Sequence, residues 1–167
     1  SYILPVKVLN YEGKGGTTEI INGLSYAYSQ NVDVVNMSLG ADYSEYSYSQ
    51  IMNQWIIRNY DSALKKLEDA GCPVIAAAGN SKSEFDAAGG YHYPAMSSYT
   101  YAVSSINSDK AFVSRYSNYG NSVVFGAPGE AVNSAGIESN TSYVNKIGTS
   151  MASPHVAGAC AVIKLFD

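Results

Sequence analysis

The sequence predicts an α/β fold in which a mostly parallel β-sheet lies between layers of helix, and three observations lead to it. Segments of strand length alternate along the chain with segments whose apolar residues recur at helical spacing. Three strand segments are joined by two helical crossovers, the kind of connection that parallel strands require. The third of them, residues 73–78, is almost wholly apolar, which is typical of a strand buried on both faces. The 167 residues contain no internal repeat or domain boundary, so we expect one domain over residues 1–167.

The predicted fold begins with a strand, a helix and a second strand. Residues 2–9 are apolar and β-rich, and a turn follows at 10–16. A helix is predicted from Thr17, because apolar side chains recur at helical spacing at Ile20, Ile21, Leu24, Ala27 and Tyr28. The second strand is predicted over residues 32–39.

A long helix is predicted next, over roughly residues 48–70. Gly71 and Pro73 end it, since glycine is favoured just past a helix C-terminus and proline does not continue a helix. The buried strand at 73–78 follows directly.

Three further strands and a final helix complete the prediction. The strands are expected at 101–106, 122–128 and 142–147. Residues 151–166 are apolar on nearly every side, and a helix of that kind is expected to be central and buried.

Composition and charge exclude several classes of function. The net charge is −4, so the chain lacks the basic face that nucleic-acid binding needs. No apolar run approaches the ~18 residues of a transmembrane helix, so no membrane partner is expected. The two cysteines, Cys72 and Cys160, are too few for a disulfide framework. Both lie among apolar residues and are interpreted as buried thiols, with a bridge between them left open.

The stretch GTSMASP, residues 148–154, places Ser150 between a flexible turn and the predicted final helix. A nucleophilic serine needs exposure at the end of a rigid element, hydrogen-bond donors for an oxyanion, and a base. The free N–H groups at a helix N-terminus carry partial positive charge, so the backbone N–H of Ser150 is a candidate oxyanion donor. Ser150 is therefore a candidate nucleophile as well as a residue that begins a helix.

Two further motifs are expected at the same edge of the sheet, because ligands bind at the carboxyl ends of parallel strands. Asn80 follows the strand at 73–78, where Gly79 permits a sharp turn and the amide offers a neutral donor. A simple Gly-Asn turn is the alternative. The segment NMSLG at 36–40 ends another strand, and its extended backbone is able to add a substrate peptide as a further strand. These residue types are also common in ordinary turns.

Together these motifs resemble the subtilisin-like serine proteases, the subtilase family. GTSMASPHVAG at 148–158 is similar to the family's nucleophile motif, and AAAGN at 76–80 to its oxyanion-asparagine motif. NVDVVNMSLG at 31–40 is similar to the strand that pairs with bound substrate. RYSNYG at 115–120 and VVFGAPG at 123–129 resemble the segment between the asparagine and the serine. Order and spacing agree over almost the whole chain.

The resemblance implies a three-layer subtilisin-like fold and hydrolysis of peptide bonds in polypeptide substrates. Ser150 would be the nucleophile, and Asn80 with the Ser150 N–H would form the oxyanion hole. The other implied residues would contact substrate. The backbone of the substrate would pair with Ser38, Leu39 and Gly40. The pocket for the residue before the scissile bond would have Ala77, Ala78 and Gly79 as its walls, and Thr149 would also contact substrate. The small and apolar side chains of the walls imply a pocket that tolerates aromatic or aliphatic side chains of the substrate.

Neither histidine is expected to act as the base. His155 lies five residues after Ser150 on the same predicted helix, so the two side chains point about 140° apart. In the family pattern this histidine is structural. His92 lies in a long loop, where a surface or packing role is expected.

The resemblance also implies that two members of the catalytic triad lie outside this chain. Subtilases carry Asp, His and Ser in that order, with the aspartate in a D-[ST]-G context and the histidine in an HGTHVAG-like motif. Neither motif occurs here. The chain is interpreted as the C-terminal part of a catalytic domain, without its N-terminal strands and its C-terminal end, and that missing N-terminal part would be its partner. Alone it would be inactive, because an unactivated serine hydroxyl is a poor nucleophile.

Two hypotheses follow. The first is a serine endopeptidase of which this chain is a part, and the alternative is a non-catalytic peptide-binding or regulatory module on a degenerate protease scaffold. No cofactor is required for the chemistry and no metal ligand is assigned. A structural calcium ion is compatible with the complete domain, and the loop near Ala95 and Thr100 is one place for a weaker cation site. The habit of the family implies a secreted or cell-surface location.

Overall fold

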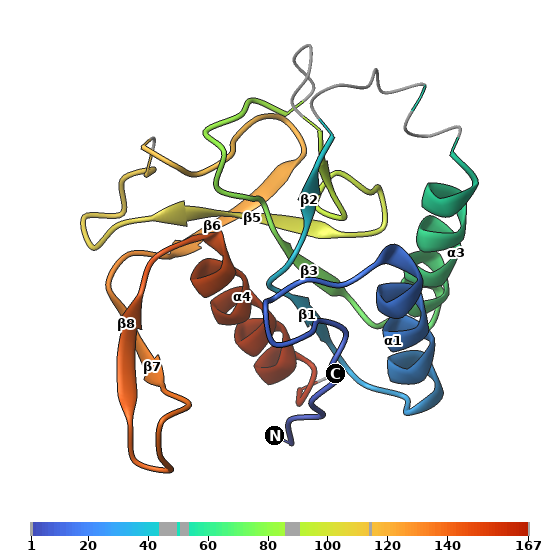
Figure 1. Cartoon of the computed structure of the whole chain (residues 1–167), viewed down its shortest axis with the longest axis horizontal. Helices are drawn as coiled ribbons and strands as arrows, with labels where there is room; N and C mark the ends of the chain where they lie inside the picture. The colour runs from blue at the N-terminus through green and yellow to red at the C-terminus, as the bar shows by residue number, and fades with distance from the viewer. Residues whose placement is uncertain (1, 44–49, 51–53, 86–90, 114, 167) are drawn as a thin grey trace.

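The computed structural model describes residues 2–43, 50, 54–85, 91–113 and 115–166. These residues form an α/β fold, so the predicted fold class is confirmed (Figure 1).

A parallel sheet of four strands forms the centre of the described residues. Its order is β1 (Val35–Met37), β3 (Val74–Ala77), β5 (Tyr101–Ile106) and β6 (Val123–Pro128). Two antiparallel pairs accompany it: β2 (Ala41–Asp42) with β4 (His92–Tyr93), and β7 (Val132–Ala135) with β8 (Tyr143–Lys146).

Helices cover both faces of this sheet (Figure 1). They are α1 (Thr17–Ser29) and α3 (Trp55–Asp69) on one face and α4 (Thr149–Ile163) on the other. The alternation of side chains along β3 explains the two layers. Val74 and Ala76 belong to the larger core with residues of α1 and α3, whereas Ile75 packs in the smaller core with Ala152 of α4. Every residue of β3 is buried, so the prediction of a strand covered on both faces is confirmed.

Most predicted elements are found where they were expected. Strands β1, β3, β5, β6 and β8 lie within their predicted ranges, and the helix predicted from Thr17 is α1. Helix α3 ends before Gly71, whose φ of +73° is a left-handed conformation that glycine adopts without strain. The first residues of the helix predicted over 48–70 fall largely outside the described residues.

The strand predicted over residues 2–9 is wrong, because this segment has no strand conformation in the structure. It packs against α1 instead. A Cβ at Gly23 would lie 2.4 Å from Val8 Cγ1 and 3.3 Å from Val6 Cγ1. Apolar, β-branched composition favours a strand only where a neighbouring strand completes the hydrogen-bond ladder, and here the described neighbour is a helix.

The prediction that the final helix is buried is also wrong. The helix spans Thr149–Ile163, and its buried residues are confined to Thr149, Ala152 and Ser153. Apolar side chains at its far end and beyond are exposed, to 60% at Ile163 and 85% at Phe166. The sequence is apolar all round, but in the described residues only the sheet side of α4 is covered, by β3, β5 and β6.

Both cysteines are free, so the bridge left open by the sequence is not formed. Cys72 is buried as expected, and its burial raises the pKa of the thiol to about 11. Cys160 is half-buried on α4. None of the helices in the described ranges is long and apolar enough to cross a membrane.

One buried hydroxyl gives a prediction about stability. Tyr60 of α3 is 4% exposed, packs edge-on against Tyr93, and its hydroxyl has no hydrogen-bond partner among the described residues. A buried polar group without a partner is destabilising, so Tyr60→Phe is expected to raise the free energy of unfolding by about 1 kcal/mol. Tyr93→Phe is the matched control, because the Tyr93 hydroxyl donates to Asp61 and its loss should lower stability. Urea denaturation measures both, and changes of the same sign would contradict the prediction.

Candidate functional site

Ser150 stands in the first turn of α4, directly after the turn that leads from β8 into the helix. Gly148 makes this turn with a φ of +142°, a conformation that other residues rarely adopt. The Ser150 side chain is half-buried, and its Oγ donates to the backbone carbonyl of Ser38 over 3.3 Å. The serine is thus held at a helix N-terminus, against the segment that follows β1.

Asn80 lies beside this turn, just after β3. The Thr149 N–H donates to Asn80 Oδ1 over 2.9 Å, and Thr149 Oγ1 lies 3.1 Å from the same oxygen. A backbone N–H only donates, so the Asn80 side-chain atom that faces Thr149 is the oxygen Oδ1. The nitrogen Nδ2 therefore points away from Thr149 and is free to donate a hydrogen bond. A Cβ at Gly148 would lie 3.4 Å from that nitrogen. The exposed Asn80 therefore presents a neutral N–H donor next to the turn that carries Ser150.

Thr149 is a support for this arrangement. It is fully buried, and besides its contacts with Asn80 it accepts a hydrogen bond from the Gly79 N–H over 3.0 Å. This burial does not fit the substrate contact expected for Thr149. Its hydroxyl ties the end of β3 to the start of α4, and thereby fixes the orientation of Asn80.

Asn118 braces the same loop from the other side, a role that the sequence analysis did not predict. It is fully buried. Its Nδ2 donates to the Ala78 carbonyl over 2.8 Å, and its Oδ1 accepts the N–H groups of Ser81 and Ser83 at 3.0 and 2.9 Å. Its own N–H donates to the Gly79 carbonyl over 3.0 Å. Only the similarity of RYSNYG to a family motif pointed to this region, because a polar residue in a polar segment looks like an ordinary loop residue.

The segment at residues 38–40 continues β1, which lies at one end of the described sheet order. Ser38 Oγ donates to the Ser150 carbonyl over 2.8 Å and lies 3.0 Å from Ser153 Oγ, so the segment is fastened to α4. Ser38 and Gly40 are exposed and Leu39 is half-buried. An extended backbone at such an edge is suited to pairing with an added peptide.

The segment at residues 77–79 continues the neighbouring strand. The register Met37↔Ala76 places it alongside residues 38–40. Ala77 is 3% exposed and Ala78 is fully buried, so their methyl groups belong to the core. Any wall that this segment offers to a ligand is made mainly by backbone atoms.

Both histidines are engaged away from Ser150. His155 Nδ1 donates to the Met151 carbonyl on its own helix over 2.8 Å. His92 belongs to β4, is 8% exposed, and its Nδ1 lies 2.7 Å from Asp42 Oδ1, so the expected packing role fits its position. In the described part of the chain, the hydrogen bond from Ser150 Oγ goes to a carbonyl, which is not a base. Ser150, Asn80 and the segments at residues 38–40 and 77–79 thus lie close together, and among the described residues neither histidine is hydrogen-bonded to Ser150.

The carboxyl of Asp42 gives a prediction about pH. The hydrogen bond from His92, with a further one from Ser81, lowers its pKa below the ordinary value of 3.8. A carboxyl with a lowered folded pKa stabilises the fold above its unfolded pKa, and that contribution is lost as the pH falls through the folded pKa. Asp42→Asn is therefore expected to lower the melting temperature at neutral pH, and the difference from the wild type should shrink below about pH 4.

The expected effect of Asp42→Asn is small, under about 1 kcal/mol, because the carboxylate side chain is 45% exposed. Thermal unfolding followed by circular dichroism across this pH range measures it, with the exposed Asp109→Asn as the control. A difference from the wild type that does not change with pH would contradict the assignment.

No group of three or more His, Cys, Asp or Glu side chains within the described ranges is placed to hold a metal ion. In the loop near Ala95, the Thr100 hydroxyl lies within hydrogen-bond distance of three carbonyls, at 2.8 Å from Pro94, 3.3 Å from Ala95 and 3.1 Å from Ser97. The hydroxyl carries one proton and donates it to one of these carbonyls at a time, the nearest being that of Pro94.

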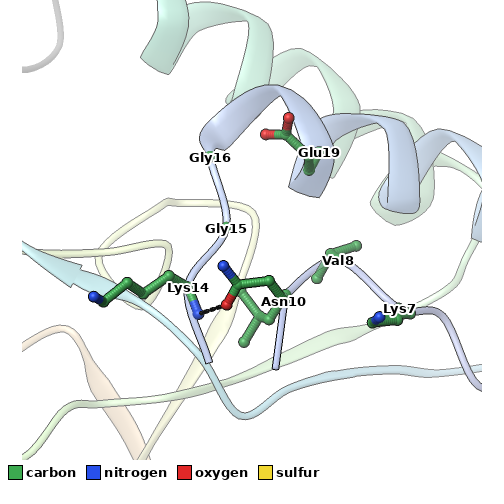
Figure 2. Close-up of a pocket in the computed structure, with 8 residues that line it drawn as sticks. Lys7, Val8, Asn10, Lys14, Gly15, Gly16 and Glu19 are labelled. Atoms are coloured by element: carbon green, nitrogen blue, oxygen red, sulfur yellow. Dashed lines mark hydrogen bonds between the residues drawn. The ribbon is translucent and has the colours of Figure 1, made fainter. Parts of the chain in front are cut away.

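A separate hollow lies where α1 begins (Figure 2). Its volume is about 440 Å³, and it is lined by Lys7, Val8, Leu9, Asn10, Lys14, Gly15, Gly16 and Glu19. The Lys14 N–H donates to Asn10 Oδ1 over 3.0 Å, which closes the turn on one side of it (Figure 2). None of the candidate site residues lines this hollow.

Known proteins show which family this chain is similar to. The family model described as the subtilase family matches residues 1–166. The chain is 40% identical over 158 residues to subtilisin DY from Bacillus licheniformis, covering 95% of this chain and 52% of that protein. It is 36% identical over 162 residues to an intracellular serine protease from Paenibacillus polymyxa, covering 97% and 45%. Among solved structures, a cold adapted subtilisin-like serine proteinase matches with a TM-score of 0.75 and 31% identity, over 95% of this chain and 52% of that one. The chain thus spans about half the length of these relatives.

Proposed function

Because this chain belongs to the subtilase family, we propose that it supplies the nucleophile part of a serine endopeptidase. Ser150 is the nucleophile, and the oxyanion hole is formed by its backbone N–H and by Asn80 Nδ2. The observation that carries the proposal is the pair of contacts from Thr149 to Asn80 Oδ1, which turn the amide nitrogen outward beside Ser150.

In the proposed reaction, Ser150 Oγ attacks the carbonyl carbon of the scissile peptide bond, and a base accepts the hydroxyl proton. The carbonyl oxygen becomes an oxyanion, which the two N–H donors stabilise. The leaving amine takes the proton, and water then hydrolyses the acyl group from Ser150 by the same steps. The base and its orienting carboxylate, His and Asp in this family, are proposed to lie outside these 167 residues.

The substrate is proposed to be a polypeptide. Its backbone lies along residues 38–40 as an added strand, and the side chain before the scissile bond lies against residues 77–79. The exposed edge at Ser38 and Gly40 and the parallel course of the two segments support this placement.

The partner is proposed to be the N-terminal part of the same catalytic domain. The exposed apolar side chains at the end of α4 and just after it support this proposal, since Val162, Ile163, Leu165 and Phe166 are 53–85% exposed. Apolar surface of this kind is stabilised by being covered. A structural calcium ion and a secreted location stay predictions for the whole protein. Relatives include a protease named as intracellular, so membership in the family alone does not favour secretion.

Labelling with a fluorophosphonate probe tests the proposal. The polypeptide that joins this chain to its upstream coding sequence is expected to react at Ser150, and Ser150→Ala is expected to abolish the reaction. This chain alone is expected to react far more slowly, because the base is proposed to lie outside these residues. No labelling of the joined polypeptide, together with an upstream sequence that lacks the Asp and His motifs, would favour the alternative of a non-catalytic peptide-binding module.

A further inference from the structure

The imidazole ring of His92 lies against both segments that are proposed to receive the substrate. A Cβ at Gly40 would lie 2.3 Å from His92 Nε2, and a Cβ at Gly79 would lie 2.8 Å from both Nδ1 and Cε1. Contacts this short mean that the ring is packed against the backbone of both residues. Gly40 and Gly79 belong to residues 38–40 and 77–79, so the ring occupies space next to both segments.

The ring is fixed in this position. Its Nδ1 donates to Asp42 Oδ1 over 2.7 Å, and Ser81 donates to the other oxygen of the same carboxylate. Asp42 and His92 are direct partners in the antiparallel pair of β2 and β4. His92 is only 8% exposed, so an outward swing of the ring would break this hydrogen bond and open a gap between the segments.

We propose that His92 limits the pocket for the residue before the scissile bond, so that this protein cleaves after small residues such as glycine, alanine and serine. The inference rests on the proposed function and names the substrate class of that same site. It replaces the expectation of a pocket tolerant of aromatic side chains, which considered only the small residues of the walls. A phenylalanine side chain needs a cleft as deep as its ring, and here an imidazole already lies in contact with both segments.

The electrostatics of the pocket agree with a small side chain. The Nδ1–H bond to Asp42 leaves Nε2 directed toward Gly40, so the inner end of the pocket is polar. Burying a large apolar side chain there would also remove water from this nitrogen without replacing its hydrogen bond. Small side chains avoid both the steric and the desolvation cost.

Cleavage of peptide p-nitroanilides that differ only at the residue before the scissile bond tests the inference. In the polypeptide joined to its upstream sequence, kcat/KM is expected to be higher for alanine than for phenylalanine. In His92→Gly the ratio of the two kcat/KM values is expected to shift toward phenylalanine by at least roughly 10-fold, the low end of the range that a single methylene gives in a hydrophobic pocket. His155→Ala is the matched control, because His155 is exposed and its ring is hydrogen-bonded to the Met151 carbonyl of its own helix, so the ratio should stay unchanged.

The outcomes separate this inference from the proposed function. Fluorophosphonate labelling together with a wild-type preference for phenylalanine would overturn the inference and leave the proposed function standing. Absence of labelling would overturn both. If His92→Gly does not fold, His92→Ser, which leaves a hydroxyl near Asp42, is expected to give a shift in the same direction. The wild-type preference decides the matter even if neither variant folds.

Discussion

Replacing Asn118 by alanine is expected to lower the free energy of unfolding by about 2–4 kcal/mol. The change removes the partner of the Ala78 carbonyl, which is buried, and of the N–H groups of Ser81 and Ser83. A buried polar group left without a partner costs about 1–3 kcal/mol, whereas the N–H of the exposed Ser81 regains a bond to water. The Ala78 carbonyl and the cavity left by the side chain therefore dominate the expected loss.

A second variant at this position separates hydrogen bonding from volume. Asn118→Asp has nearly the same shape and keeps an oxygen for Ser81 and Ser83, but it places a carboxylate oxygen against the Ala78 carbonyl. We expect it to be at least as destabilising as alanine at neutral pH, because two acceptors then face each other. Urea denaturation measures both variants, with Asn121→Ala in an exposed turn as the control. A loss below about 1 kcal/mol for Asn118→Ala would contradict the bracing role.

The correctly predicted elements are those that depend on residues near one another in the sequence. They also include segments whose apolar residues follow a very clear pattern. Strand β3 was predictable because its residues are nearly all apolar, and α1 because apolar side chains recur on one face. The end of α3 was predictable because glycine and proline restrict the backbone locally, whatever the tertiary structure is.

The elements that were mispredicted depend on what lies beside them. Residues 2–9 have the composition of a strand, but a strand also requires a partner strand, and α1 lies there instead. Helix α4 has the composition of a buried helix, but burial requires cover on every face, and the described chain covers only one. The composition of a segment indicates which secondary structure it favours. It does not indicate whether the partner strand or covering elements that this structure needs are present.

The candidate site divides in the same way. Ser150 and Asn80 were predicted because short motifs carry them. The supporting roles of Asn118, Thr149 and His92 were not predicted, because these residues act through contacts between segments distant in sequence. His92 meets Asp42 through two-residue strands 50 positions apart, and no local pattern signals such a pair. The contacts of Thr149 with Gly79 and Asn80 bridge 70 and 69 positions.

Thr149 shows how folding and the proposed chemistry are connected. Its hydrogen bonds join the end of β3 to the start of α4, the two elements that carry Asn80 and Ser150. The contacts that hold the sheet to the helix therefore also orient the proposed oxyanion donor. A change that removes the donor while keeping these contacts separates the two effects.

Asn80→Asp is such a change, and it is expected to have the largest effect on activity. One carboxylate oxygen keeps the contacts with Thr149, so the free energy of unfolding should change by less than about 1 kcal/mol. The second oxygen replaces the outward Nδ2 and places a negative charge where the oxyanion forms. Removing one such donor in subtilisin, a relative in this family, lowers turnover by about 10²–10³-fold, and we carry that range over as the minimum.

The measurement is kcat and KM for one peptide substrate in the polypeptide joined to its upstream sequence, with urea denaturation in parallel. We expect kcat to fall and KM to change little, because the donor acts on the oxyanion of the transition state and not on the bound ground state. Asn133→Asp, an exposed residue on β7, controls for the added negative charge. A fall in kcat of less than about tenfold would remove Asn80 from the oxyanion hole, because one lost donor in a preorganised site costs far more than that.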